Sequence, residues 1–137
     1  MFQISTVADK IMNSVNDTEV IMICPVSGTN TGTMVYDCIK HMSGFDKVIT
    51  SDVVEFSYGK HISGNFYVLP WASSKEFVPA LVNVIKKEEV TVLVPGSDWE
   101  LKVIADNIDI FNRLGVVVLM NSSKVMNICF DKERTVS

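Results

Sequence analysis

The chain has 137 residues, of which 47% are hydrophobic and 20% charged, with a formal net charge of −4. This balance is typical of one folded domain, excludes a disordered chain, and argues against a domain that works on nucleic acid. No apolar run approaches the ~20 residues that span a bilayer and the N-terminus lacks a signal-peptide pattern, so we expect no membrane partner and a cytoplasmic location.

The N-terminal half alternates between helical and strand patterns. Residues 4–16 carry apolar side chains at three- and four-residue spacing, which predicts an amphipathic helix. The apolar run at 19–24, ended by Pro25, predicts a buried parallel strand. A loop over 26–33 and a short helix over 34–42 follow. Residues 45–52 then predict a second strand.

The C-terminal half continues this alternation. Residues 53–64 show no clear period and are expected to be irregular, and the third strand ends at Pro70. Ser73 with Glu76 predicts a capping box that starts a helix. After a fourth strand over 90–95, Ser97 with Glu100 predicts a second capping box, and a single helix then runs to Gly115. A fifth strand over 116–120 and a short last helix complete the pattern.

Strands that alternate with helices predict right-handed β-α-β units and a parallel sheet. We therefore predict an α/β fold: a Rossmann-like, three-layer domain with a five-stranded parallel sheet and helices on both faces. The whole chain, 1–137, is expected to form one domain, with an N-terminal helix over 1–18 and a β/α core over 19–135. The strands are expected near 20–24, 46–50, 66–69, 91–94 and 116–119.

Two loops at the carboxyl ends of the predicted strands could contact a ligand. The glycine loop "VSGTNTG" lies where backbone amides can bind an anion, although a tight strand-to-helix turn needs the same small residues. It matches neither G-x-G-x-x-G nor the P-loop pattern, and it is partly similar to the phosphate loop of flavodoxins. Asp52 ends the second strand, where a dinucleotide fold places its ribose-binding acid. Asp98 and Glu100 favour the helix dipole with or without a ligand.

Cysteine and histidine residues predict no further chemistry. Cys24, Cys38 and Cys129 are far apart in sequence and have apolar neighbours, so we expect buried, inert thiols rather than disulfides or a zinc site. His41 and His61 have no partner at metal-ligand spacing and are expected at the surface or in turns. We expect no catalytic residue and no metal ligand in this chain.

The order of features over about residues 18 to 135 resembles the N-terminal (pre-ATP-grasp) domain of ATP-grasp enzymes of the carbamoyl-phosphate-synthase-like kind. A strand ending in Pro70 is followed by a helix, and the next strand runs into Pro95 with Asp98 and Glu100. A long helix, a Leu-Gly turn, a short strand and a helix ending in "DKERT" complete the match.

The resemblance implies a substrate-side domain of an ATP-dependent carboxylate–amine ligase that is not catalytic alone. Such enzymes use ATP and Mg²⁺ in further domains of the same polypeptide to activate a carboxylate for attack by an amine, and we expect those domains to be absent from this chain. In the full-length protein, Lys132 of the Asp-Lys-x-x-Thr motif is expected to reach the ATP phosphates. The residues expected to bind the small carboxylate or amine substrate are Ser27, Gly28, Thr29, Asp52, Ser97, Asp98 and Glu100.

Two further expectations stay open. A free-standing flavodoxin-like or nucleotide-binding module is the alternative to a ligase domain, and a homodimer is possible for either. A coding sequence that continues past Thr135 with a second glycine-rich, lysine-bearing segment would favour the ligase, and a yellow purified protein would favour the flavodoxin-like module.

Overall fold

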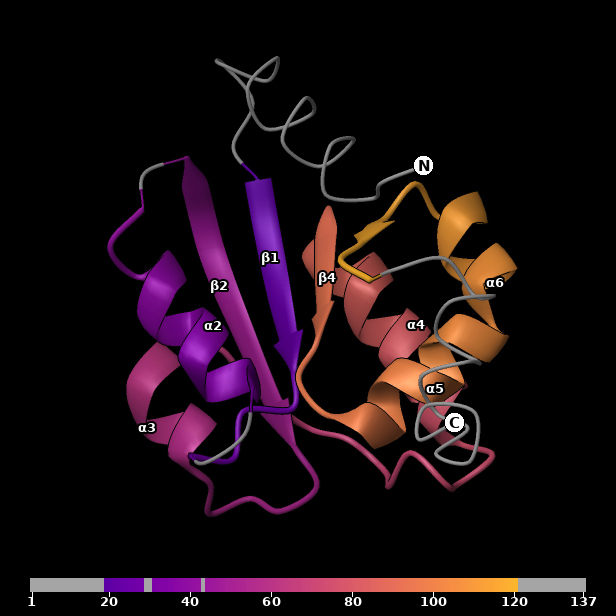
Figure 1. Ribbon diagram of the computed structural model, residues 1–137, viewed down its shortest axis with the longest axis horizontal. Coiled ribbons are helices and arrows are strands. Elements are labelled where there is room, and N and C mark those ends of the chain that lie inside the picture. The colour runs from indigo at the N-terminus through magenta and orange to yellow at the C-terminus, as the bar shows by residue number, and fades with distance from the viewer. Residues whose placement is uncertain (1–18, 29–30, 43, 121–137) are drawn as a thin grey trace, which may run out of the picture.

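A computed structural model of the chain describes residues 19–28, 31–42 and 44–120. Its centre is a five-stranded, wholly parallel sheet in the spatial order β3-β2-β1-β4-β5 (Figure 1). The strands are β1 (Glu19–Cys24), β2 (Phe45–Asp52), β3 (Phe66–Val68), β4 (Val92–Pro95) and β5 (Val117–Val118). The predicted parallel α/β sheet is therefore confirmed.

Helices cover both faces of the sheet, as Figure 1 shows. The two on one face are α2 (Thr31–Ile39) and α3 (Tyr58–Ser63), and the three on the other are α4 (Phe77–Glu88), α5 (Asp98–Asp106) and α6 (Ile108–Arg113). The helices predicted over 4–16 and after Asn121 lie outside the described residues.

Each face of the sheet has its own hydrophobic core because successive side chains of a strand point to opposite faces. Met22 and Cys24 of β1 join the larger core with the buried sides of α4, α5 and α6. Ile21 and Ile23 join the smaller core under α2 and α3. Because both faces of β1 are buried, its side chains must be apolar on both sides. This explains the continuous apolar sequence from which the strand was predicted.

Helix α3 lies where irregular chain was predicted, so that prediction was wrong. The helix has six residues and no apolar stripe of its own. Contacts from distant segments hold it instead: the Gly59 N–H donates to Val26 O at 3.1 Å, the Thr50 hydroxyl donates to Gly59 O at 2.9 Å, and the Tyr36 hydroxyl donates to Ile62 O at 2.7 Å. A periodicity search cannot detect a helix that is stabilised in this way.

The single helix predicted from Ser97 to Gly115 is divided at Asn107 into α5 and α6, which corrects the prediction. The Asn107 side-chain amide donates to Val103 O at 2.8 Å, and asparagine side chains compete in this way with helical hydrogen bonds. The apolar face itself is confirmed, because Ile104 and Phe111 are buried in one core.

The capping box predicted from Ser73 and Glu76 does not form. Helix α4 begins at Phe77, and the Ser74 side chain, not that of Ser73, accepts a hydrogen bond from the Glu76 N–H at 3.2 Å. Ser73 instead lies on the wall of a pocket described below. The buried face predicted for this helix is confirmed in full: Phe77, Leu81, Val84 and Ile85 are all buried.

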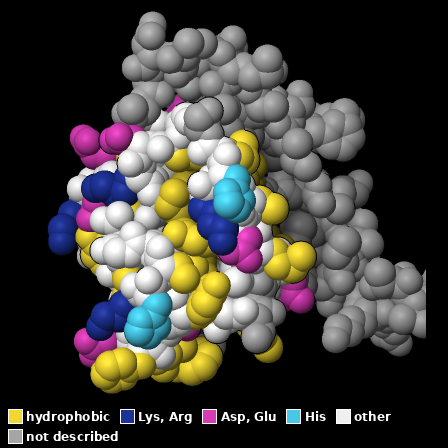
Figure 2. Space-filling model, turned by 90° about the vertical axis from the view of Figure 1, so that its left-hand side faces the viewer, with side chains coloured by type: hydrophobic (Ala, Val, Ile, Leu, Met, Phe, Trp, Pro, Cys, Tyr) yellow, Lys and Arg dark blue, Asp and Glu magenta, His cyan; other side chains and the backbone are white. Residues whose placement is uncertain are grey.

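The face covered by α2 and α3 is partly apolar at its surface. Figure 2 shows hydrophobic side chains spread across this face between scattered charged groups and histidines. Both His41 and His61 are exposed, as predicted. Cys38 is also exposed, which corrects the prediction of a buried thiol, because it lies on the outer side of α2. In the described residues no helix has the length and hydropathy needed to cross a bilayer.

Candidate functional site

The candidate site lies where the chain leaves β1 and β4, the two central strands. These strands are hydrogen-bonded neighbours, with Cys24 opposite Pro95, yet β1 leads to α2 on one face and β4 leads to α5 on the other. Neighbouring parallel strands whose connections go to opposite faces leave a crevice at their carboxyl ends, and α/β proteins place ligands there. This is the edge at which the sequence predicted a site.

Glycine is required at this edge because three backbone segments meet there. A Cβ atom on Gly96 would lie 2.2 Å from Pro25 O, and one on Gly32 would lie 2.0 Å from the same oxygen. The Gly96 N–H donates to Cys24 O at 2.7 Å, and the Gly32 N–H donates to Gly96 O at 3.2 Å. The Pro-Gly sequence after β4 therefore lets this strand pass close to the start of α2.

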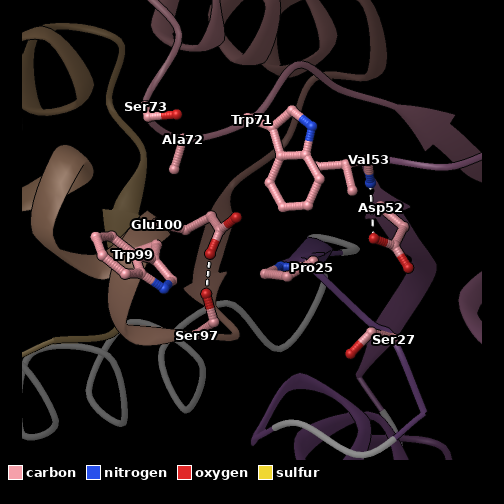
Figure 3. Close-up of a pocket in the computed structure, with 10 residues that line it drawn as sticks. All are labelled: Pro25, Ser27, Asp52, Val53, Trp71, Ala72, Ser73, Ser97, Trp99 and Glu100. Atoms are coloured by element: carbon pink, nitrogen blue, oxygen red, sulfur yellow. Dashed lines mark hydrogen bonds between the residues drawn. The ribbon is translucent and has the colours of Figure 1, made fainter.

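A pocket of about 470 Å³ opens at this edge (Figure 3). Its volume falls in the range of roughly 300–1,000 Å³ that is usual for small-molecule sites. Its wall is formed by residues at or after the carboxyl ends of β1, β2, β3 and β4. The lining residues are Pro25, Ser27, Asp52, Val53, Trp71, Ala72, Ser73, Ser97, Trp99 and Glu100.

The structure brings four of the predicted site residues together. Ser27, Asp52, Ser97 and Glu100 all line the pocket, although they come from three different loops. Two other predicted residues do not line it: the Gly28 N–H donates to Thr33 of α2, and Asp98 is exposed at the start of α5. Thr29 and Lys132 lie outside the described residues.

Two glycine amides of the glycine loop donate hydrogen bonds within the protein. The Gly28 N–H donates to the Thr33 hydroxyl at 2.9 Å, and the Gly32 N–H donates to Gly96 O at 3.2 Å. Gly28 has a φ of +102°, which is a conformation that side chains disfavour. Because both amides already have acceptors, these contacts favour the tight-turn interpretation of this loop over anion binding.

Glu100 is the most unusual residue of the pocket, since its side chain is only 6% exposed. The Ser97 hydroxyl donates to its carboxylate. Ser97 is the N-cap residue of α5, as predicted, but its side chain bonds to Glu100 rather than to a backbone amide, so the predicted capping box forms only in part. Burial raises the pKa of Glu100; its own backbone N–H opposes this shift, and the negative charge of Asp52 adds to it.

Glu100→Gln is expected to raise the stability of the protein at pH 7.5. A carboxyl group whose pKa is raised by folding stabilises the native state at low pH. This stabilisation is lost as the pH rises from the ordinary glutamate pKa of about 4.3 through the raised pKa of the folded protein. Glutamine does not ionise, so the variant does not lose stability in this way. The gain should therefore disappear at pH 4. Urea unfolding of both proteins at the two pH values measures it. Glu89→Gln, at an exposed position, is the control, and an equal gain at both pH values would contradict the explanation.

Six of the ten lining residues were not predicted to be part of a site, and two of these six are tryptophans. Trp71 and Trp99 are 68% and 78% exposed, and both line the pocket. Trp71 directly follows Pro70, at which the third strand was predicted to end. Trp99 lies four residues after Pro95, the last residue of β4. An aromatic residue directly after a predicted strand end was the signal that could have identified them.

Other reactive side chains do not add to this site. Burial raises the pKa of the Cys24 thiol to about 12, so this thiol stays protonated and inert, as predicted. Among residues 19–28, 31–42 and 44–120, no group of three histidine, cysteine or acidic side chains could hold a metal ion. The chemistry of the pocket therefore rests on its two carboxylates, its serines and its two indole rings.

Comparison with known proteins agrees with this geometry. The family described as "PylC-like, N-terminal domain" matches residues 8–119, which is most of the chain. The chain belongs to this family. The PylC-like N-terminal domain is the pre-ATP-grasp domain of ATP-grasp ligases, so the resemblance seen in the sequence is confirmed at this level. A search of curated proteins finds no match to the chain.

The strand order decides against the flavodoxin-like alternative. Flavodoxins have the order 2-1-3-4-5, whereas this PylC-like domain has 3-2-1-4-5, the order of the first five strands of a dinucleotide-binding fold. The partial likeness of the glycine loop to that family was therefore misleading.

ATP, which the ligase superfamily uses, does not fit the pocket of this PylC-like domain. In the described part of the chain, the two charged residues on its wall, Asp52 and Glu100, are both acidic, and no lysine or arginine lines it. Phosphates need cationic or amide donors, and the Gly28 and Gly32 amides of the glycine loop already have acceptors. The described walls of this pocket therefore do not favour a nucleotide phosphate.

Proposed function

We propose that this domain holds a small substrate of an ATP-dependent carboxylate–amine ligase of the carbamoyl-phosphate-synthase-like kind. The pocket at the carboxyl ends of β1, β2, β3 and β4 would bind and orient the carboxylate or amine substrate. Activation by ATP and Mg²⁺ would take place in further domains of the same polypeptide, in the cytoplasm. On this proposal the domain alone has no ligase or ATPase activity.

The observation that carries the proposal is the place of the pocket. It lies at the crevice between β1 and β4, where this class of sheet binds ligands, and four residues expected to bind substrate meet there. Family membership supports an ATP-grasp ligase, because the matching domain is the N-terminal part of such enzymes.

The test is to express the chain alone and together with the protein sequence encoded after Ser137. We expect ADP to form from ATP only with the longer protein, and only when a carboxylate and an amine are both supplied. Steady ATP turnover by the purified 137-residue chain would overturn the proposal. A downstream sequence without a glycine-rich, lysine-bearing segment would overturn it too.

Lys132→Ala in the longer protein is expected to lower kcat/KM for ATP by about 10- to 150-fold. This range corresponds to the loss of a charge-assisted hydrogen bond to phosphate, about 1.5–3 kcal/mol. Lys86→Ala removes an exposed lysine from the end of α4 and is the matched control. Steady-state kinetics at saturating co-substrate measure both variants. If Lys132→Ala leaves both KM for ATP and kcat unchanged, Lys132 does not contact the nucleotide.

A further inference from the structure

The pocket has two large aromatic walls that the fold does not need. Trp71 and Trp99 are 68% and 78% exposed, whereas the core is formed by other residues, such as Phe77 and Phe111. Tryptophan usually buries most of its surface, so an exposed pair on one pocket is unusual. In Figure 3, the Glu100 carboxylate lies between the two indole rings. The loops after β3 and β4 thus bring two π-faces to one cavity.

The ionisable side chains on the pocket wall are both acidic. Asp52 is 8% exposed and Glu100 is 6% exposed, and none of the described residues that line the cavity is a lysine, arginine or histidine. Asp52 Oδ1 accepts a hydrogen bond from the Val53 N–H at 2.7 Å, and Glu100 accepts one from the Ser97 hydroxyl. These neutral donors do not balance two negative charges. The two carboxylates also affect each other, because the charge of Asp52 disfavours ionisation of Glu100.

A positively charged ligand would satisfy both features of this pocket. A cation between two buried carboxylates offsets their repulsion, and an ammonium group donates hydrogen bonds that carboxylates accept. Indole is the best of the side-chain rings for cation–π contact. Among the described lining residues, an anion would meet two like charges and no donor with a formal positive charge. The same walls therefore favour an ammonium ion and oppose a free carboxylate.

We propose that this pocket binds the amine substrate through an ammonium group, with Asp52 and Glu100 as counter-charges and Trp71 and Trp99 as flanking π-faces. The inference rests on the proposed function in that the ligand belongs to a carboxylate–amine ligase, and it assigns the amine, rather than the carboxylate, to this domain. A volume of about 470 Å³ admits an aliphatic body as well as the charged group.

The chain itself provides the reporter for a test. It has two tryptophans, Trp71 and Trp99, and both line the pocket, so intrinsic fluorescence reads this cavity directly. Three probes of similar length carry head groups of different charge: butylammonium is positive, 1-butanol is neutral and butanoate is negative. We expect butylammonium to change the emission of the 137-residue chain at the lowest concentration and butanoate at the highest.

Variants then assign the contacts. Asp52→Asn and Glu100→Gln should each weaken butylammonium binding about 10-fold or more, which matches the loss of a hydrogen bond to a charged group. Trp99→Ala should weaken it by about 2- to 30-fold, the range of a cation–π contact, and the remaining Trp71 then reports binding. Trp99→Phe keeps an aromatic face and should recover part of the loss. Asp109→Asn, which removes an exposed acid from α6, is the control and should change nothing.

The outcomes separate this inference from the proposed function. Tighter binding of butanoate than of butylammonium would overturn the inference and leave a ligase domain that holds the carboxylate substrate. Equal binding of all three probes, or equal affinity in Asp52→Asn and wild type, would also overturn it. Failure of the proposed function itself would appear elsewhere, in ATP turnover by the longer protein.

Discussion

Phe111→Ala is expected to lower the free energy of unfolding by about 3–5 kcal/mol, the usual loss when a fully buried phenylalanine is truncated. The Phe111 side chain is 0% exposed and lies in the larger core with Ile104 and Val118. It connects α6 to the sheet, directly after the break at Asn107. Because folded domains are stable by only about 5–15 kcal/mol, this one change should remove a large part of the total. Urea unfolding followed by far-UV circular dichroism measures it.

Phe56→Ala makes the same chemical change at the surface and serves as the matched control. Phe56 is 87% exposed, and its ring makes a cation–π contact with Lys60, whose Nζ lies 5.6 Å from the ring centre. Such an exposed cation–π pair contributes about 0.5–1 kcal/mol, so a loss of no more than this is expected. Equal losses for the two variants would show that Phe111 is not packed as the structure has it.

Much of the fold could be predicted from the sequence because the central strands are simple. Strands β1 and β4 are buried on both faces, so both read as continuous apolar runs that end in proline. The buried face of α4 has regular helical spacing and was predicted residue by residue. In these elements the local pattern and the tertiary environment agree.

The prediction was wrong where tertiary contacts override the local pattern. Helix α3 depends on hydrogen bonds to Val26, Thr50 and Tyr36, which come from other segments. The helix after Ser97 is divided at Asn107 because one side-chain amide bonds to a backbone carbonyl. Neither feature alters the apolar periodicity that a sequence search measures.

The candidate site was partly predictable for a geometric reason. The carboxyl ends of parallel strands meet at one edge, so polar residues after predicted strands, such as Asp52 and Ser97, could be placed together. The two tryptophans were missed because Trp71 lies in a loop and Trp99 lies in the first turn of α5, where a single aromatic residue creates no periodic pattern. The burial of both Asp52 and Glu100 could not be predicted from the sequence either, because it depends on which strands become neighbours in the sheet.

The neighbouring positions of β1 and β4 connect the fold to the proposed ligand. Residues 24 and 95 lie opposite one another in the sheet although 71 positions separate them in the chain. This pairing brings Ser97 and the first turn of α5, which carries Glu100, to the same pocket as Pro25 and Ser27. It requires that the backbone of α2 and of the β4 loop come very close, and two glycines permit this.

Gly96→Ala is therefore expected to lower the free energy of unfolding by about 3 kcal/mol, the upper end of the usual cost of overpacking. The added Cβ atom would lie 2.2 Å from Pro25 O and 3.0 Å from the Gly32 Cα. Both are backbone atoms, which cannot rotate away as a side chain does. Retreat of the β4 loop would in turn break the hydrogen bond from the Gly96 N–H to Cys24 O, now 2.7 Å long. Urea unfolding measures the loss.

Gly115→Ala separates this steric cost from the ordinary cost of replacing a glycine. Gly115 has a φ of +76°, and nothing lies within 4 Å of an added Cβ, so only backbone strain of about 1–2 kcal/mol is expected there. Gly96→Ala should also shift the tryptophan emission of the folded protein, because the segment that must move leads directly into the first turn of α5, which carries Trp99. A loss for Gly96→Ala below that for Gly115→Ala, with unchanged emission, would mean that the three backbone segments do not meet at this edge of the sheet.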